Sequence, residues 1–163
     1  LAITRLALWE PPYFLDGSPH RPPADTATTY NELVSAGRRG DAVEFFMAKV
    51  VGLPDEFVAF ARSQPWWPAQ EALAHTLAYD AACMGDGPPP TARLARITQP
   101  TLVATGGGTP DAHAGGLPSG FMDRAADAIA ASIPQAERQV IGGAGHMVDA
   151  KLVAPVLERF FGR

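Results

Sequence analysis

Hydrophobic and polar positions follow two rhythms along this chain, and the rhythm changes twice. Short runs with strand character cover residues 3–9, 100–105 and 137–141. The first two runs are mostly apolar and are bounded by proline or glycine, which is typical of strands buried on both faces of a parallel sheet. The run at 3–9 gives way to Glu10, because two prolines follow and proline cannot continue a strand ladder.

Residues 25–91 follow a helical rhythm instead. Apolar positions recur there every three or four residues, most clearly at Val43, Phe46, Met47, Val50 and Val51. The pattern predicts helices over about 25–37, 41–51, a short segment after Pro54, and about 69–84. A linker rich in glycine and proline, residues 85–90, then closes the segment.

Strand and helix alternate again after residue 92. A helix with one apolar face over 122–133 lies between the second and third strands, and an apolar helix over 152–161 follows the third. Asp149 is placed to cap that last helix by accepting its first backbone N–H groups. Alternation at this spacing predicts parallel strands joined by right-handed crossovers. The sequence therefore predicts an α/β fold, parallel strands flanked by helices, with a helical segment inserted after the first strand.

The composition fits a soluble globular chain with one core. The chain has 163 residues, of which 47% are hydrophobic, and a net charge of −4. Its basic residues are scattered, which argues against nucleic-acid binding. No apolar run approaches the roughly 20 residues that span a membrane, so we expect no membrane partner. The single cysteine, Cys83, lies in an apolar helical pattern and is expected to be buried, and we expect a cytoplasmic location.

The residue with the clearest chemical setting is a histidine in the turn after the third predicted strand. Gly142, Gly143 and Gly145 allow the chain to turn tightly and to bring His146 close to another backbone segment. The carboxyl edge of a parallel sheet is where ligands meet the fold. His146 is therefore our candidate for a general base that later acts as a general acid.

The order of these elements resembles the C-terminal half of an α/β-hydrolase. The residues that carry the resemblance are 97–106, similar to the family's penultimate core strand, and 142–146, similar to its last strand and catalytic histidine. The resemblance implies that residues 1–13 and 92–163 form the C-terminal half of the core and that residues 14–91 form the helical lid. We expect the chain to be a fragment of a longer protein.

The half that carries the nucleophile elbow is absent from these residues. The family's Gly-x-Ser-x-Gly motif does not occur, and the nearest string, residues 116–120, has the wrong spacing and no strand before it. The resemblance implies an esterase-like hydrolase that cleaves a small, largely apolar substrate with a nucleophile from outside this chain. The alternative is a catalytically inactive fragment or subunit that acts as a binding or assembly module.

The acid that would orient His146 has two candidates. The family's usual acid position falls on Thr109, which is not acidic, and Asp111 lies two residues further on. Glu10 ends the first predicted strand, where some family members, among them haloalkane dehalogenases, carry the acid. We favour Glu10 because a carboxylate leaving the carboxyl end of a parallel strand lies at the ligand-binding edge, and Asp111 stays open as the alternative.

Other candidate sites are few. Trp66 and Trp67, between two prolines, are our candidates for substrate-lining residues. The glycines at 106–108 lack the spacing of a nucleotide-binding loop, and no helix follows promptly, so we expect no cofactor. Histidines and carboxylates at ligating spacing are missing, so we expect no metal. A sheet of three strands leaves an edge to which the missing N-terminal half or a second copy would pair.

Overall fold

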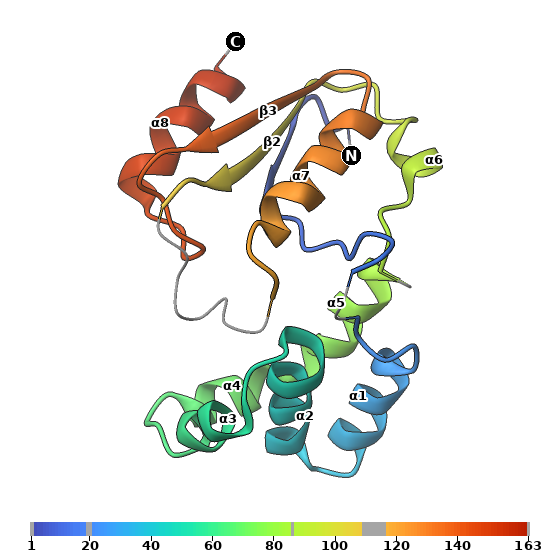
Figure 1. Cartoon of the computed structure of the whole chain (residues 1–163), viewed down its shortest axis with the longest axis vertical. Coiled ribbons are helices and arrows are strands. Elements are labelled where there is room, and N and C mark those ends of the chain that lie inside the picture. The colour runs from blue at the N-terminus through green and yellow to red at the C-terminus, as the bar shows by residue number, and fades with distance from the viewer. Residues whose placement is uncertain (1, 19–20, 86, 109–116, 163) are drawn as a thin grey trace. The chain divides into compact units, whose positions relative to one another are not determined.

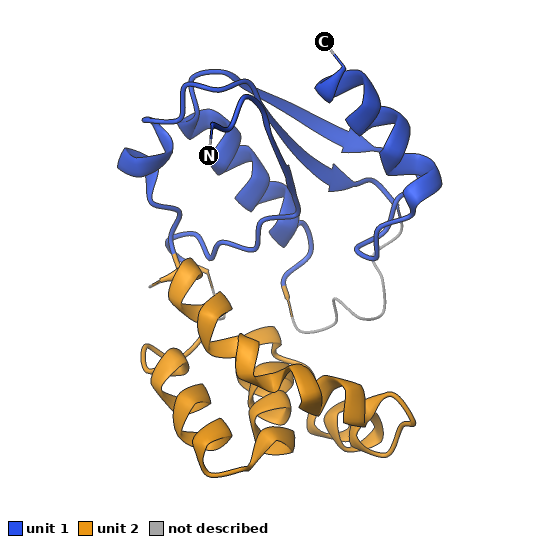
Figure 2. Cartoon of the chain, turned by 180° about the vertical axis from the view of Figure 1, so that it is seen from behind, with its two compact units in different colours: residues 1–17, 88–114, 118–163 blue, residues 18–87, 115–117 orange. Residues whose placement is uncertain are grey.

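The computed structural model describes residues 2–18, 21–85, 87–108 and 117–162, which divide into two compact units (Figure 1, Figure 2). Unit 1 contains the described residues up to 17 and those from 88 onward except Leu117. Unit 2 contains the described residues of 18–87 together with Leu117. The chain therefore leaves unit 1 after its first strand and returns to it for the rest of the sheet.

Unit 1 is built on a parallel sheet with the strand order β1-β2-β3. The strands are β1 (Leu6–Trp9), β2 (Thr101–Gly106) and β3 (Ala136–Ile141). In the register, Thr101 lies between Leu6 of β1 and Ala136 of β3. The α/β prediction is confirmed, although β1 begins at Leu6 rather than at residue 3.

Helices cover both faces of this sheet (Figure 1). The elements are α6 (Thr91–Leu94), α7 (Phe121–Ser132) and α8 (Ala150–Phe161). Leu102 and Ala104 of β2 belong to the cluster of buried residues that α8 completes, whereas Val103 belongs to the cluster of α7. Successive side chains of a strand point to opposite faces. A strand covered on both faces must therefore bury every side chain: β2 is apolar at Leu102, Val103 and Ala104, and the hydroxyls of its buried Thr101 and Thr105 form hydrogen bonds.

The amino-terminal end of α8 has the cap that the sequence predicts. Oδ1 of Asp149 accepts a hydrogen bond from the backbone N–H of Lys151 at 2.9 Å. This bond satisfies one of the amide groups that have no partner inside the first turn of a helix. The cap fixes the point at which the turn bearing His146 becomes helix.

All regular elements among the described residues of unit 2 are helical. Its elements are α1 (Thr26–Ser35), α2 (Arg39–Phe45), a π-helical turn (Phe46–Val51), α3 (Asp55–Arg62), α4 (Trp67–Leu73), a 3₁₀ turn (Ala74–Thr76) and α5 (Leu77–Met84). The π-helical turn ends at Gly52, whose φ of 78° is the left-handed conformation that glycine adopts at helix ends. No helix of the described residues is long and apolar enough to cross a membrane.

Two predictions about unit 2 are wrong in detail. The helix expected over 69–84 is interrupted at the 3₁₀ turn, where Oγ1 of Thr76 donates to the carbonyl of Leu73. Hydroxyl groups that bond to nearby backbone carbonyls compete with regular helix geometry. Cys83 is exposed rather than buried, because it lies on the outer side of α5 while Ala78 faces the core.

The core of unit 2 contains one unsatisfied polar group. Tyr30 is 2% exposed and packs edge-to-face on Phe45, with ring centroids 5.4 Å apart. Its hydroxyl is buried and has no hydrogen-bond partner. Burial, and after it the negative charge of Asp80, raises the pKa of Tyr30 far above its ordinary value. The phenol is therefore a destabilising group within an otherwise apolar cluster.

Candidate active site

Glu10 occupies a strained position at the end of β1. Its backbone N–H still donates to the carbonyl of Ala104 at 2.9 Å, which continues the pairing with β2. Its φ is +42°, and it is the one non-glycine residue with positive φ among the described parts of the chain. A residue before proline normally has φ near −120°, so Pro11 adds to the strain. Strain of this kind, held by the surrounding structure, is common where a side chain has a function.

The carboxylate of Glu10 lies against His146. Oε2 of Glu10 is 2.6 Å from Nδ1 of His146, and Oε1 accepts a hydrogen bond from the backbone N–H of Gly106 at 3.0 Å. A carboxylate only accepts hydrogen bonds, so in this pair Nδ1 carries the hydrogen. That tautomer leaves Nε2 as the ring nitrogen that can take a proton.

Burial differs sharply between the two partners. The side chain of Glu10 is 7% exposed and that of His146 is 46% exposed. The acid is thus enclosed by protein, whereas the imidazole is partly exposed. A buried carboxylate whose two oxygens both accept hydrogen bonds can hold the ring in one orientation without taking part in proton exchange itself.

The turn that carries His146 is held by its backbone. The carbonyl of Ala144, a fully buried residue, accepts a hydrogen bond from the N–H of Gly108 at 2.8 Å. Nε1 of Trp9 donates to the carbonyl of His146 at 3.4 Å. Gly143 has a φ of 78°, a conformation that glycine adopts without strain. The predicted close approach of this turn to another backbone segment is therefore present.

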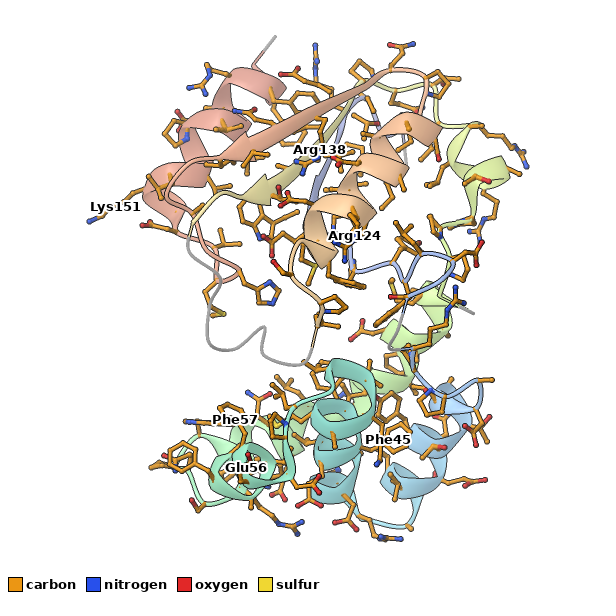
Figure 3. The ribbon with its side chains drawn as sticks, in the orientation of Figure 1. Phe45, Glu56, Phe57, Arg124, Arg138 and Lys151 are labelled. Carbon is orange, nitrogen blue, oxygen red and sulfur yellow. The ribbon has the colours of Figure 1, made fainter. Side chains whose placement is uncertain are left out.

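A polar cluster braces the same strand ends on the α7 side of the sheet (Figure 3). The guanidinium of Arg138 on β3 donates to Oγ1 of Thr105 at 2.9 Å and to Oδ1 of Asp123 at 2.7 Å. It also donates to Oδ1 of Asp127 at 2.8 Å. Thr105 donates to the same Asp123 oxygen at 2.6 Å. Thr105 directly precedes Gly106, so the brace fixes the strand end that binds Glu10.

The sequence-predicted site residues fall into three groups. His146 and Glu10 come together, whereas Asp111 lies outside the described residues. Trp66 and Trp67 both belong to unit 2, where Trp66 is 42% exposed and Trp67 is 4% exposed. Nε1 of Trp67 donates to Glu71 at 3.0 Å inside the helical core. No group of three side chains suited to a metal ion occurs among the described residues.

Two parts of this arrangement were missed from the sequence. The brace around Arg138 had one available signal, a charged residue in the middle of a predicted strand. The contacts of residues 106–108 had another, since consecutive glycines after a strand indicate close backbone approach as well as phosphate binding. Both segments support the contact between Glu10 and His146, and both lie far from Glu10 in the sequence.

Comparison with known proteins identifies the family of this chain. A solved structure of an α/β-hydrolase from Sphaerobacter thermophilus DSM 20745 is 44% identical in sequence, with a TM-score of 0.79. The match covers 99% of this chain and 59% of that protein. The chain belongs to the α/β-hydrolase fold family. It spans less than two thirds of the length of that α/β-hydrolase.

Further solved structures match the chain more weakly. A 2-hydroxy-6-oxo-6-phenylhexa-2,4-dienoate hydrolase from Rhodococcus sp. strain RHA1 is 18% identical, with a TM-score of 0.45, over 98% of this chain and 55% of its own. NosK from Streptomyces actuosus is 19% identical, with a TM-score of 0.45, over 98% of this chain and 58% of its own. No protein-family model matches the chain, and no curated protein matches it.

Proposed function

We propose that this chain supplies the general base and the orienting acid of a hydrolase that cleaves an ester or a related bond in a small, largely apolar substrate. The observation that carries the proposal is the 2.6 Å contact between Nδ1 of His146 and Oε2 of Glu10. The position of Glu10 at a strand end favours it over Asp111 as the acid. Localisation in the cytoplasm is part of the proposal.

In the proposed reaction, Nε2 of His146 takes the proton of a hydroxyl nucleophile that lies outside these residues. The nucleophile attacks the substrate carbonyl, and His146 then gives the proton to the leaving group, which leaves the acyl group on the nucleophile. Water, deprotonated by the same histidine, then attacks this acyl group, and the proton returns to the nucleophile as the acid product departs. Glu10 fixes the tautomer and stabilises the imidazolium that forms between the two steps. This reaction needs no cofactor and no metal, since the nucleophile, base and acid supply all of the proton transfers.

An apolar substrate fits the surface next to the imidazole. Met147 and Val148 follow His146 directly and are 74% and 56% exposed. Large apolar side chains exposed beside a reactive group are typical of a binding surface. Unit 2 would act as the lid, and its exposed Trp66 is a better candidate for substrate contact than the buried Trp67.

The experiment is hydrolysis of p-nitrophenyl acetate by the chain and by any longer form that its gene encodes. In whichever form is active, His146→Ala is expected to lower kcat by at least about a thousandfold. The matched control is His75→Ala, because His75 is an exposed residue of unit 2 whose Nδ1 donates to the carbonyl of Ala72 and whose ring lies edge-on to that of Tyr79. Full activity of the His146→Ala variant would refute the assignment.

The second candidate is a binding or assembly module, which the described sheet favours in one respect. β1 and β3 each have one neighbouring strand among the described residues, so each offers an edge to a further strand. The proposed partner is the N-terminal half of the fold or a second copy of the chain. Hydrolysis by residues 1–163 alone, lost in His146→Ala, would exclude an inactive module.

A further inference from the structure

Three consecutive glycines begin at the last residue of β2, Gly106, continue with Gly107 and Gly108, and lie directly against the backbone of the turn that carries His146. None of the three has a positive φ, so backbone conformation alone does not require glycine at any of these positions. The requirement comes from space. Their sequence pattern argues against a nucleotide-binding loop, and the structure gives them a different role.

The missing side chains leave room for one carbonyl group. A Cβ atom on Gly106 would lie 2.4 Å from the carbonyl oxygen of Ala144, and one on Gly108 would lie 2.8 Å from the same oxygen. Both distances are far below van der Waals contact, and the atom that would have to move belongs to the backbone. A Cβ on Gly107 would meet Cγ1 of Val140 at 2.8 Å, but Val140 is 54% exposed and its side chain can rotate away.

The backbone amides of the same three residues hold both members of the catalytic pair. The N–H of Gly106 donates to Oε1 of Glu10 at 3.0 Å. The N–H of Gly108 donates at 2.8 Å to the carbonyl of Ala144, two residues before His146. Between them, the N–H of Gly107 donates to the carbonyl of Ile141 at 2.9 Å and so continues the pairing of β2 with β3.

We propose that residues 106–108 are positioning residues. They hold Glu10 and the turn that carries His146 at one rigid strand end, and thereby set the contact between Glu10 and His146. The catalytic meaning of this role rests on the proposed function, but the positioning itself does not. The same tripeptide binds both Glu10 and the turn that carries His146. Preorganisation on a rigid element is what a catalytic pair needs to hold its geometry.

The test uses alanine substitutions in the 163-residue chain and nitrogen-15 NMR of the histidine ring. In Gly108→Ala, the hydrogen on Nδ1 of His146 is expected to exchange with water, so that its NMR signal disappears. Amide exchange at residue 108 is expected to accelerate about tenfold or more. The matched control is Gly142→Ala, because a Cβ on Gly142 would meet nothing within 4 Å. Gly107→Ala is expected to resemble the control, since only an exposed valine must move.

A second measurement is amide exchange, which begins with the unsubstituted chain. The amides of Gly106 and Gly108 are both expected to be protected from exchange, and Glu10→Ala is expected to remove protection at Gly106 while leaving it at Gly108. The proposal is overturned if Gly108→Ala keeps the Nδ1 signal of His146 while folded, or if either amide exchanges freely in the unsubstituted chain. Neither result depends on ester hydrolysis, so a failure here is distinct from a failure of the proposed function.

Discussion

Replacing Glu10 with glutamine should change which nitrogen of His146 carries the hydrogen. The new side chain has one oxygen and one NH₂ group, and the surroundings decide where each goes. The N–H of Gly106, 3.0 Å from Oε1, requires an oxygen there. The NH₂ group must then face Nδ1 of His146, which lies 2.6 Å from the position of Oε2. Nδ1 becomes an acceptor, and the hydrogen moves to Nε2.

The magnitude follows from the alternative orientation. Turning the amide over would set its NH₂ group against the N–H of Gly106 and leave a buried donor without an acceptor. That arrangement costs about 1–3 kcal/mol, so the first orientation should dominate by roughly fivefold to 150-fold. With a hydrogen on Nε2 the ring cannot accept the proton of a nucleophile, and the imidazolium also loses the stabilising charge of Glu10, so hydrolysis should fall by more than about tenfold and by up to about four orders of magnitude.

Nitrogen-15 NMR of the labelled histidine distinguishes the two tautomers directly, and p-nitrophenyl acetate turnover measures the consequence. The control is Glu32→Gln, the same change at an exposed position of α1. It should alter neither the tautomer nor the rate. The reasoning is refuted if the Glu10→Gln variant, still folded, keeps its hydrogen on Nδ1, or if its rate stays within about tenfold of the unsubstituted protein.

Three stability predictions follow from single side chains and can be checked by urea unfolding. Tyr30→Phe should raise the free energy of unfolding by about 1 kcal/mol, because the buried hydroxyl has no partner. Since burial raises the pKa of Tyr30, the stability of the unsubstituted chain should be complete below the ordinary tyrosine pKa of about 10 and fall above it; the substitution should weaken that fall. Asp149→Ala should cost about 1 kcal/mol through the lost cap of α8, while Asp149→Asn should retain most of it. Glu71→Ala should cost about 1–2 kcal/mol by leaving the indole N–H of Trp67 unpaired, and an equal loss in Glu71→Gln, which keeps an acceptor oxygen, would contradict this account.

The sheet could be predicted from the sequence because its signals are local. β2 is apolar at successive positions and lies between Pro100 and the glycines, so its bounds of Thr101–Gly106 differ from the expected 100–105 by one residue. The helical segment was harder. Apolar periodicity indicates a helical face. It does not reveal the hydrogen bond from Thr76 to a backbone carbonyl, which interrupts the predicted helix over 69–84.

The site could be predicted as a set of residue types but not as a geometry. Glu10 was a candidate because it ends a predicted parallel strand, and His146 was a candidate because it lies in a glycine-rich turn. The positive φ of Glu10, and the contact of Gly106 with the carbonyl of Ala144, arise only when three segments meet in space. The substrate-lining role of Trp66 and Trp67 stays a prediction, and burial of Trp67 in the helical core now favours Trp66 for it.

The insertion of unit 2 between β1 and β2 has a consequence for how the molecule forms. Within unit 2 even α1 and α5, which pack together, are separated by less of the chain than β1 and β2, which must find each other across the whole inserted segment. Local contacts form quickly, and pairing between distant segments is slow because loop closure costs entropy before any contact compensates for it. We therefore expect the helical unit to form first and β1 to join the sheet late. Glu10 arrives with β1, so the acid should reach its histidine in one of the last steps of folding.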